Sequence, residues 1–127
     1  MTVQKWPLLS LCKLLMLYKI DAKNQKLGRL ASDIAVILQG KKKPSYESRL
    51  EGGDAVEVTN IHDLVVTGRK KTTKIYYKHS GPLGHLKEKK FKDVWAKNPA
   101  WVLRHAVNLM LPKNRLRARR IKKLIIK

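Results

Sequence analysis

Residues 17–40 read LYKIDAKNQKLGRLASDIAVILQG, and this stretch decides the fold. Its first five residues have the composition of a short strand, and a polar turn follows at residues 23–26. The next apolar residues recur with the spacing of an amphipathic helix; they are Leu27, Leu30, Ala31, Ile34 and Leu38. Gly40 stands where a helix C-cap is expected. A strand, a short turn and a helix in this order begin an α/β unit.

Further strands are expected downstream of this unit. Residues 55–59 alternate between apolar and polar side chains, which predicts a strand. The continuous apolar run at residues 64–67 is typical of a strand that is buried on both faces. Residues 72–78 are rich in β-branched and aromatic side chains, so they predict either a strand or an extended arm.

Two helices are expected in the second half of the chain. Phe91, Val94 and Trp95 mark one face of a short helix. Pro99 suits the first turn of the next helix, and Pro112 ends it. We expect this second helix to bury a broad apolar face made of Trp101, Val102, Leu103, Ala106, Val107, Met110 and Leu111. The sequence contains no internal repeat, which predicts a single domain over residues 18–127 with a basic tail from about residue 112.

The composition points to a polyanionic partner. The chain has 127 residues, with 29 Lys and Arg against 9 Asp and Glu, and a net charge of +20. Its hydrophobic content of 43% is sufficient for a core. The single cysteine, Cys12, excludes an intrachain disulfide and a cysteine-built metal site. Nucleic acid is the favoured partner, and an anionic membrane surface is the main competitor.

The positive charge is unevenly distributed. Residues 41–68 carry four bases and five acids, whereas residues 94–127 carry ten bases and no acid. Basic runs occur at residues 41–43, 69–71, 87–92 and 113–127. Like charges repel one another in such runs, and phosphate is the natural compensator.

Catalytic and metal-binding chemistry is poorly supported. Residues 67–72 (TGRKKT) lack the spacing of a phosphate-binding loop, and no helical pattern follows them. His79 and His85 share a glycine-rich loop, but no carboxylate or thiol nearby completes a metal site. Ser80 has no orienting acid for nucleophilic catalysis. We therefore expect no enzyme activity, no catalytic residue, no metal, no cofactor and no small-molecule substrate.

The segment at residues 1–17 is apolar and leucine-rich. It is too short for a membrane-spanning helix, which needs about 20 apolar residues. A signal peptide or an organellar presequence would have this composition, and residues 8–17 could anchor a cationic protein at a membrane surface. We favour a packing segment whose leucines cover an apolar patch.

The basic segments supply the chemistry of RNA binding. Lysine and arginine contact phosphate, an exposed tyrosine stacks on a base, and arginine forks bind phosphate with two hydrogen bonds. Only one of Tyr76 and Tyr77 is expected to be free if they lie on a strand. No zinc-finger, helix-turn-helix or RNP signature is present, which favours recognition of folded RNA by shape. The candidate RNA-binding residues are Lys41, Lys42, Lys43, Arg69, Lys70, Lys71, Lys74, Tyr77, Lys78, His79, His85, Lys87, Lys113, Arg115, Arg117, Arg119, Arg120, Lys122 and Lys123.

Several short motifs, taken in order, resemble a known family. They are IDA at residues 20–22, LGRLAS at 27–32, GKKKPSY at 40–46, GD at 53–54, VTGRKKTTKIYYKHSG at 66–81 and MLPKN at 110–114. Together they resemble the bacterial-type large-ribosomal-subunit protein thirteen family. The resemblance implies a three-layer α/β/α domain around a small, mostly parallel four-stranded sheet. It also implies a structural, non-catalytic protein that binds large-subunit rRNA early in assembly.

The resemblance carries expectations about partners and sites. It implies 23S-type rRNA and neighbouring large-subunit ribosomal proteins as partners, with no membrane. It implies rRNA contacts at residues 41–43, 69–78, His79, His85 and the region after residue 112. Leu109, Asn114 and Arg117 stand where the family commonly has glycine. The location is then the large ribosomal subunit in the cytoplasm or in an organelle, and the alternative function is an RNA-binding regulator outside the ribosome.

Overall fold

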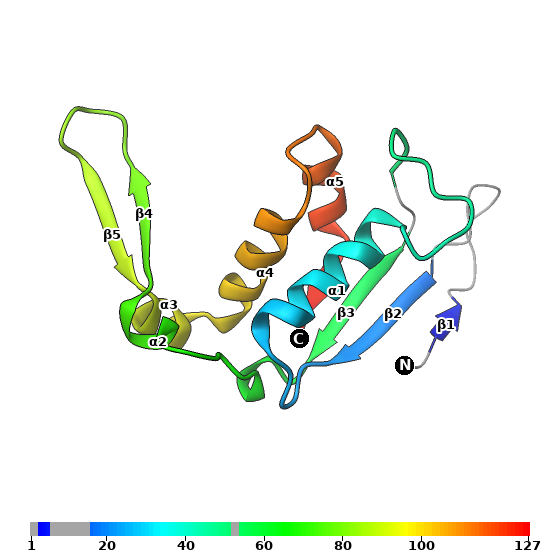
Figure 1. Ribbon diagram of the computed structural model, residues 1–127, viewed down its shortest axis with the longest axis horizontal. Coiled ribbons are helices and arrows are strands. Elements are labelled where there is room, and N and C mark those ends of the chain that lie inside the picture. Colours follow the sequence, from blue (N-terminus) through cyan, green and yellow to red (C-terminus); the bar gives the residue numbers. More distant parts are fainter. Residues whose placement is uncertain (1–2, 6–15, 52–53) are drawn as a thin grey trace.

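The computed structural model describes residues 3–5, 16–51 and 54–127, and it shows an α/β arrangement with a mostly parallel sheet (Figure 1). Most of the expected N-terminal segment, residues 1–17, lies outside the described residues. The elements in chain order are β1 (Val3–Lys5), β2 (Met16–Asp21), α1 (Leu27–Gln39), β3 (Ala55–Thr59), a 3-10 helix (Ile61–Asp63), α2 (Lys70–Thr73), β4 (Ile75–His79), β5 (Leu86–Lys90), α3 (Phe91–Lys97), α4 (Pro99–Met110), α5 (Leu116–Lys122) and β6 (Leu124–Ile126).

Strand β3 lies at the centre of the parallel sheet. It pairs in parallel with β2, where Leu17 is opposite Ala55, and with β6, where Val56 is opposite Leu124. Strand β1 extends the sheet by pairing antiparallel with β2. The C-terminal residues therefore complete the sheet at the edge away from β1.

Helix α1 forms where the spacing of the apolar residues predicted it, so that prediction is confirmed. Four of its five predicted core residues, from Leu30 to Leu38, are buried, and Leu27 packs against the same core. Gly40 adopts a left-handed conformation with φ 78°, and its amide donates to the Ile37 carbonyl at 2.8 Å. Glycine enters this region without a Cβ clash, which is why it ends the helix. The helix lies over β3 (Figure 1).

Helix α4 packs beside α1 and buries a narrower face than expected. Its start is fixed by Pro99 in the first turn and by the Asn98 side chain, which accepts a hydrogen bond from the Trp101 amide at 3.0 Å. Val102 and Val107 are buried, but Trp101 is 40% exposed. Successive helical residues are about 100° apart, so adjacent apolar residues cannot all face one core.

The prediction of a strand at residues 64–67 is wrong. Val65 forms only an isolated bridge with Lys26, donating to the Gln25 carbonyl and accepting from the Leu27 amide. This segment therefore pairs with the turn that leads into α1. It cannot enter the sheet beside β3, because β2 and β6 occupy both edges of that strand.

Two other expectations are corrected by the structure. Residues 70–73 form the short helix α2, so the strand expected at residues 72–78 begins only at Ile75. Strands β4 and β5 then form a separate two-stranded sheet. The C-terminal residues were expected as a basic tail, but they fold into α5 and β6, with Leu124 in the core.

Candidate nucleic-acid interface

The β4–β5 hairpin, residues 75–90, projects away from the rest of the molecule (Figure 1) and is called the arm here. Its tip is closed by Ser80, whose amide and hydroxyl both donate to the His85 carbonyl, at 3.1 and 3.0 Å. Gly81 and Gly84 at the tip have φ values of 103° and 79°. The tip thus needs glycine at both of these positions.

The two faces of the arm differ in chemistry. Side chains alternate along a strand, and residues directly opposite share a face. One face therefore carries Lys78, Lys87 and Lys89, and Lys78 is directly opposite Lys87. The other carries Tyr77 opposite Glu88, and His79 opposite Leu86. Two lysines directly opposite repel each other, so an anion bound between them would stabilise the pair.

The two tyrosines of the arm point to different environments. Tyr76 makes edge contacts with Trp101 and His105, at ring-centroid distances of 5.1 and 5.2 Å. Burial raises the pKa of the Tyr76 hydroxyl. Tyr77 is 60% exposed. The expectation that only one tyrosine would be free is confirmed, and the free one is Tyr77.

Aromatic side chains join the root of the arm to α4. The rings of Trp101 and His105 stack with centroids 4.8 Å apart, and the Lys74 ammonium lies 5.1 Å from the centre of the Tyr76 ring. Burial, followed by the positive charge of Lys74, lowers the pKa of His105. His105 therefore belongs to the aromatic cluster that packs the root of the arm against α4.

Both histidines of the arm tip are exposed, and a backbone contact orients one of them. The Nδ1 atom of His79 accepts a hydrogen bond from the Gly81 amide at 3.2 Å. In the neutral ring the proton then resides on Nε2, which becomes a donor. The side chain of His85 is also exposed, and its carbonyl closes the tip. Both expected positions therefore lie on the surface.

The basic residues before the arm are exposed as expected. Gly68, with φ 71°, turns the chain into helix α2. Phe91, where α3 begins, donates its amide to the Lys74 carbonyl at 2.9 Å and thereby ties the two strands together at the root. The exposed candidates in this region are Arg69, Lys70, Lys71 and Lys74.

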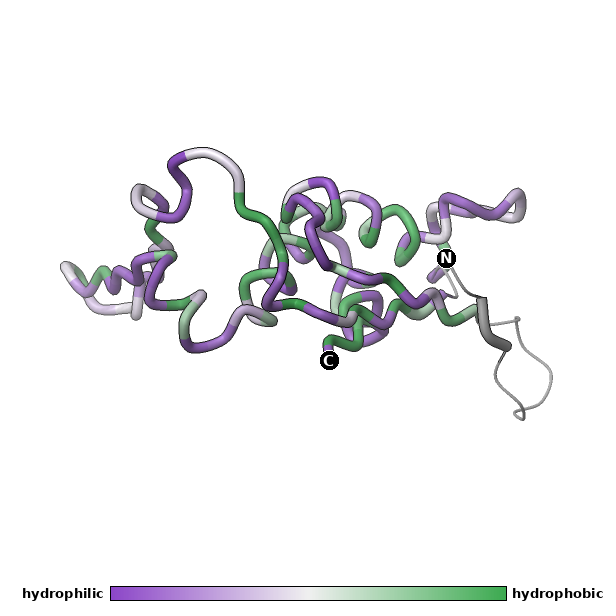
Figure 2. Tube along the Cα trace, turned by 90° about the horizontal axis from the view of Figure 1, so that it is seen from below, coloured by the Kyte–Doolittle hydropathy of each residue, from purple (hydrophilic) through white to green (hydrophobic). Residues whose placement is uncertain are grey.

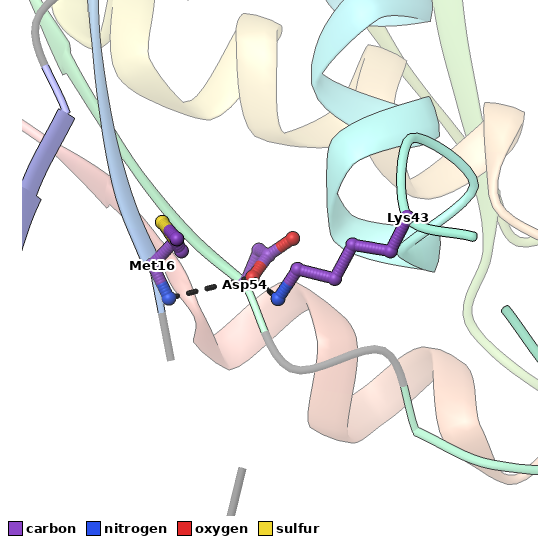
Figure 3. Close-up of polar contacts among 3 residues, drawn as sticks. All are labelled: Met16, Lys43 and Asp54. Atoms are coloured by element: carbon purple, nitrogen blue, oxygen red, sulfur yellow. Dashed lines mark hydrogen bonds and ion pairs between the residues drawn. The ribbon is translucent and has the colours of Figure 1, made fainter. Parts of the chain in front are cut away.

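The loop after α1, residues 41–51, is called the first loop here. Lys41 and Lys42 are exposed at its start. Lys43 instead forms an ion pair with Asp54, whose side chain is 1% exposed (Figure 3). The three adjacent lysines are therefore not equivalent, because the third one neutralises a buried carboxylate.

The basic residues of the C-terminal segment differ in their surroundings. Three of them have partners within the protein: Arg120 donates to the Leu50 carbonyl, Lys123 pairs with Glu51, and Lys127 pairs with Glu57. Arg117 is half-buried. The exposed candidates are Lys113, Arg115, Arg119 and Lys122.

Arg120, one of the candidate RNA-binding residues, is buried within the protein. Its side chain is 2% exposed, and Nη2 donates to the Leu50 carbonyl at 3.1 Å. A buried guanidinium requires polar partners within the protein, and this one has a carbonyl 70 residues away in sequence. Arg120 therefore anchors α5 to the first loop.

Three basic segments extend toward the same side of the molecule. In Figure 1, the tip of the arm, the first loop and the segment between α4 and α5 all lie toward the top of the view. Figure 2 shows hydrophilic stretches along the arm and along the first loop. The candidate interface is thus a discontinuous surface supported by the α/β core.

Sequence reasoning missed Lys89 as a member of this surface. It lies on the same face of the arm as Lys78 and Lys87. The signal was the two-residue period from Lys87 to Lys89, which places both side chains on one face of a strand. The segment that forms β5 (LKEKK) contains no β-branched or aromatic residue, so it did not indicate a strand.

Three positions where the family that this chain resembles commonly has glycine hold larger side chains without backbone strain. Leu109 lies in α4, Arg117 lies in α5, and Asn114 donates its amide to the Pro112 carbonyl at 2.9 Å. Within the described ranges, the non-glycine residues with positive φ are Asn24 and Asn60. The side chains at these three positions therefore require no left-handed backbone.

Over the residues that the structure describes, no helix is long and apolar enough to cross a membrane. The same residues contain no group of three or more His, Cys, Asp or Glu side chains that could hold a metal ion.

The fold and the surface define a small, basic α/β protein that displays its charge on an arm, a loop and a C-terminal helix. The family profile described as Ribosomal protein L13 matches residues 16–126, and the chain belongs to this family. It is 50% identical over 109 residues to the large ribosomal subunit protein uL13 of Chloroflexus aggregans, covering 86% of this chain and 76% of that protein.

Other relatives agree with this assignment. The uL13 protein of Clostridioides difficile is 45% identical over 107 residues, covering 84% of this chain and 75% of the relative. That of Lawsonia intracellularis is 49% identical over 107 residues, covering 84% and 74%. The chain is therefore a structural, non-enzymatic ribosomal protein of the large subunit in the cytoplasm.

Proposed function

We propose that this protein binds 23S-type rRNA of the large subunit through the arm, the first loop and the C-terminal segment, and that it supports early subunit assembly. The observation that carries the proposal is the arm, where Lys78 and Lys87 are directly opposite each other on an exposed hairpin. Such a pair costs free energy in the unbound protein, and phosphate oxygens between the two ammonium groups would offset that cost.

The candidate residues would act in two ways. The exposed lysines and arginines would contact phosphate and provide most of the affinity. Tyr77 would stack on an unpaired base, and the Nε2 donor of His79 would reach a phosphate or base edge. The remaining members of the surface are Lys41, Lys42, Arg69, Lys70, Lys71, Lys74, His85, Lys89, Lys113, Arg115, Arg117, Arg119 and Lys122.

The dependence of binding on salt tests the proposal. The double variant Lys78→Gln/Lys87→Gln should weaken binding to a large-subunit rRNA fragment. It should also reduce the slope of log K against log salt by about two units, because two phosphate contacts are lost. The matched control is Lys23→Gln/Lys26→Gln, which removes two exposed charges from the β2–α1 turn. Equal slopes for the two double variants would contradict the proposal.

Two finer structural expectations accompany this function. One is a three-layer α/β/α domain over residues 18–127 around a four-stranded sheet, for which the packing of α1 against β3 supports one helical layer. The other is contact with neighbouring large-subunit proteins. The exposed apolar side chains of Trp101, Leu109 and Met110 on α4 support such contact.

A further inference from the structure

We propose that the first loop and helix α5 act as a single rRNA-binding unit, and that Asp54, Glu51 and Arg120 are positioning residues that hold this unit in its binding shape. The inference rests on the proposed binding of rRNA, and it assigns a role to acidic side chains that would otherwise oppose that binding. The loop contributes the exposed Lys41 and Lys42, whereas α5 contributes the exposed bases Arg119 and Lys122.

The first contact holds the start of the loop against the sheet. The Oδ1 atom of Asp54 accepts from the Lys43 ammonium and from the Met16 amide, the latter at 3.4 Å (Figure 3). Asp54 directly precedes β3, and Met16 begins β2. A buried carboxylate is costly unless it is paired and hydrogen-bonded, so Asp54 strongly favours the position of Lys43 that is observed. Lys41 and Lys42 are thereby held near a fixed point.

Two further contacts hold the end of the loop against α5. The buried Arg120 donates to the Leu50 carbonyl at 3.1 Å, and the Lys123 ammonium lies 2.8 Å from Glu51 Oε1. Arg120 lies in α5 and Lys123 is the C-cap residue of this helix, with right-handed helical φ and ψ; the two are three residues apart and so lie on the same side of its last turn. Two adjacent loop residues are therefore bound to one side of α5.

These contacts give the loop a shape before RNA is present. A loop that is free in the unbound protein must lose conformational entropy when it binds, and that loss reduces affinity. Glu51 and Asp54 hold the loop in place, and this lowers the cost. Their negative charge has the opposite effect, because it repels phosphate. For Glu51, the gain in affinity from positioning the loop outweighs the loss from charge repulsion.

The sign of the effect of Glu51→Gln separates these two contributions. Charge alone predicts that removing any acid from the first loop tightens RNA binding. We expect instead that Glu51→Gln weakens binding to a large-subunit rRNA fragment by about threefold or more, since the loop must be ordered on binding. The matched control is Glu47→Gln in the same loop, where Glu47 pairs with Arg49, two residues away, at 3.0 Å. This variant should bind RNA as tightly as the unchanged protein, or up to about twofold more tightly.

Two additional measurements make the test specific. Amide hydrogen exchange of residues 41–50 in the free protein should accelerate in Glu51→Gln and not in Glu47→Gln. In a Lys123→Gln background the Glu51–Lys123 ion pair is already absent, so Glu51→Gln should no longer weaken binding. Circular dichroism of each variant verifies that the fold is retained.

The possible outcomes are distinct. If Glu51→Gln tightens binding as Glu47→Gln does, or leaves loop exchange unchanged, the positioning role is overturned. If the unchanged protein shows no salt-dependent affinity for the rRNA fragment, the proposed function fails. The exchange data would still show in that case whether the Glu51–Lys123 ion pair orders the first loop.

Discussion

The α/β core and the arm use charged residues in opposite ways. Where the C-terminal segment meets the core, acids pair with bases, as Glu51 does with Lys123 and Glu57 with Lys127. On the arm, Lys78 faces Lys87, and none of the ion pairs found among the described residues involves the arm. The paired charges hold the C-terminal segment to the rest of the protein. The two like charges that face each other on the arm remain available to a ligand. A net charge of +20 therefore contains two populations of charge with different roles.

The largest difference between the two regions is expected in stability. Ile34 is fully buried between α1 and the core, and Ile34→Ala should lower the free energy of unfolding by about 2–5 kcal/mol, because it leaves a cavity. Leu83 at the arm tip is 98% exposed, and Leu83→Ala should change that free energy by less than about 0.5 kcal/mol. Urea unfolding monitored by circular dichroism measures both. Similar losses would show that the arm folds as part of the core.

A smaller effect is expected in the pH dependence of stability. The hydrogen bond from the Lys127 ammonium lowers the pKa of Glu57 below the ordinary glutamate value. A lowered pKa in the folded state gives stability that is fully present above the unfolded pKa, about 4.3, and is lost as the pH falls through the folded pKa.

Replacing either partner should remove this acid-sensitive contribution. Glu57→Gln and Lys127→Gln should each flatten the decline in stability below about pH 4.3, relative to the unchanged protein. Thermal unfolding from pH 5 down to pH 3 measures the decline. Parallel curves for Glu57→Gln and the unchanged protein would show that this pair does not dock the C-terminal strand.

The parts of the fold that sequence reasoning predicted are those governed by local rules. The periodicity of α1, the glycine at its C-terminal end and the proline at the start of α4 each reflect a constraint within a few residues. The apolar run at residues 64–67 was misinterpreted because an apolar run does not specify its neighbours. β6, from the far end of the chain, occupies the place beside β3.

The candidate site shows the same limit. Arg120 and Arg119 are adjacent arginines in one basic run, yet only Arg119 is exposed. The difference depends on the Leu50 carbonyl, 70 residues away, which no local pattern indicates. Lys43 is likewise distinguished from Lys41 and Lys42 only by the buried Asp54. Composition predicted the kind of surface, and long-range contacts decided which bases belong to it.

The smallest predicted effect tests the opposed lysines directly. Removing one of two like charges that face each other across a hairpin relieves repulsion, so Lys87→Gln should stabilise the free arm by about 0.2–1 kcal/mol while it weakens RNA binding. Amide hydrogen exchange of β4 at low salt measures the gain, which should shrink as the salt concentration rises because salt screens the repulsion. Lys41→Gln is the control, since Lys41 lies in a loop outside any strand pair; it should weaken binding without changing exchange in the arm. Slower amide exchange together with weaker RNA binding in Lys87→Gln would show that Lys87 lowers the stability of the free arm and raises its affinity for RNA. Unchanged exchange at low salt would mean that the two ammonium groups do not oppose folding of the arm.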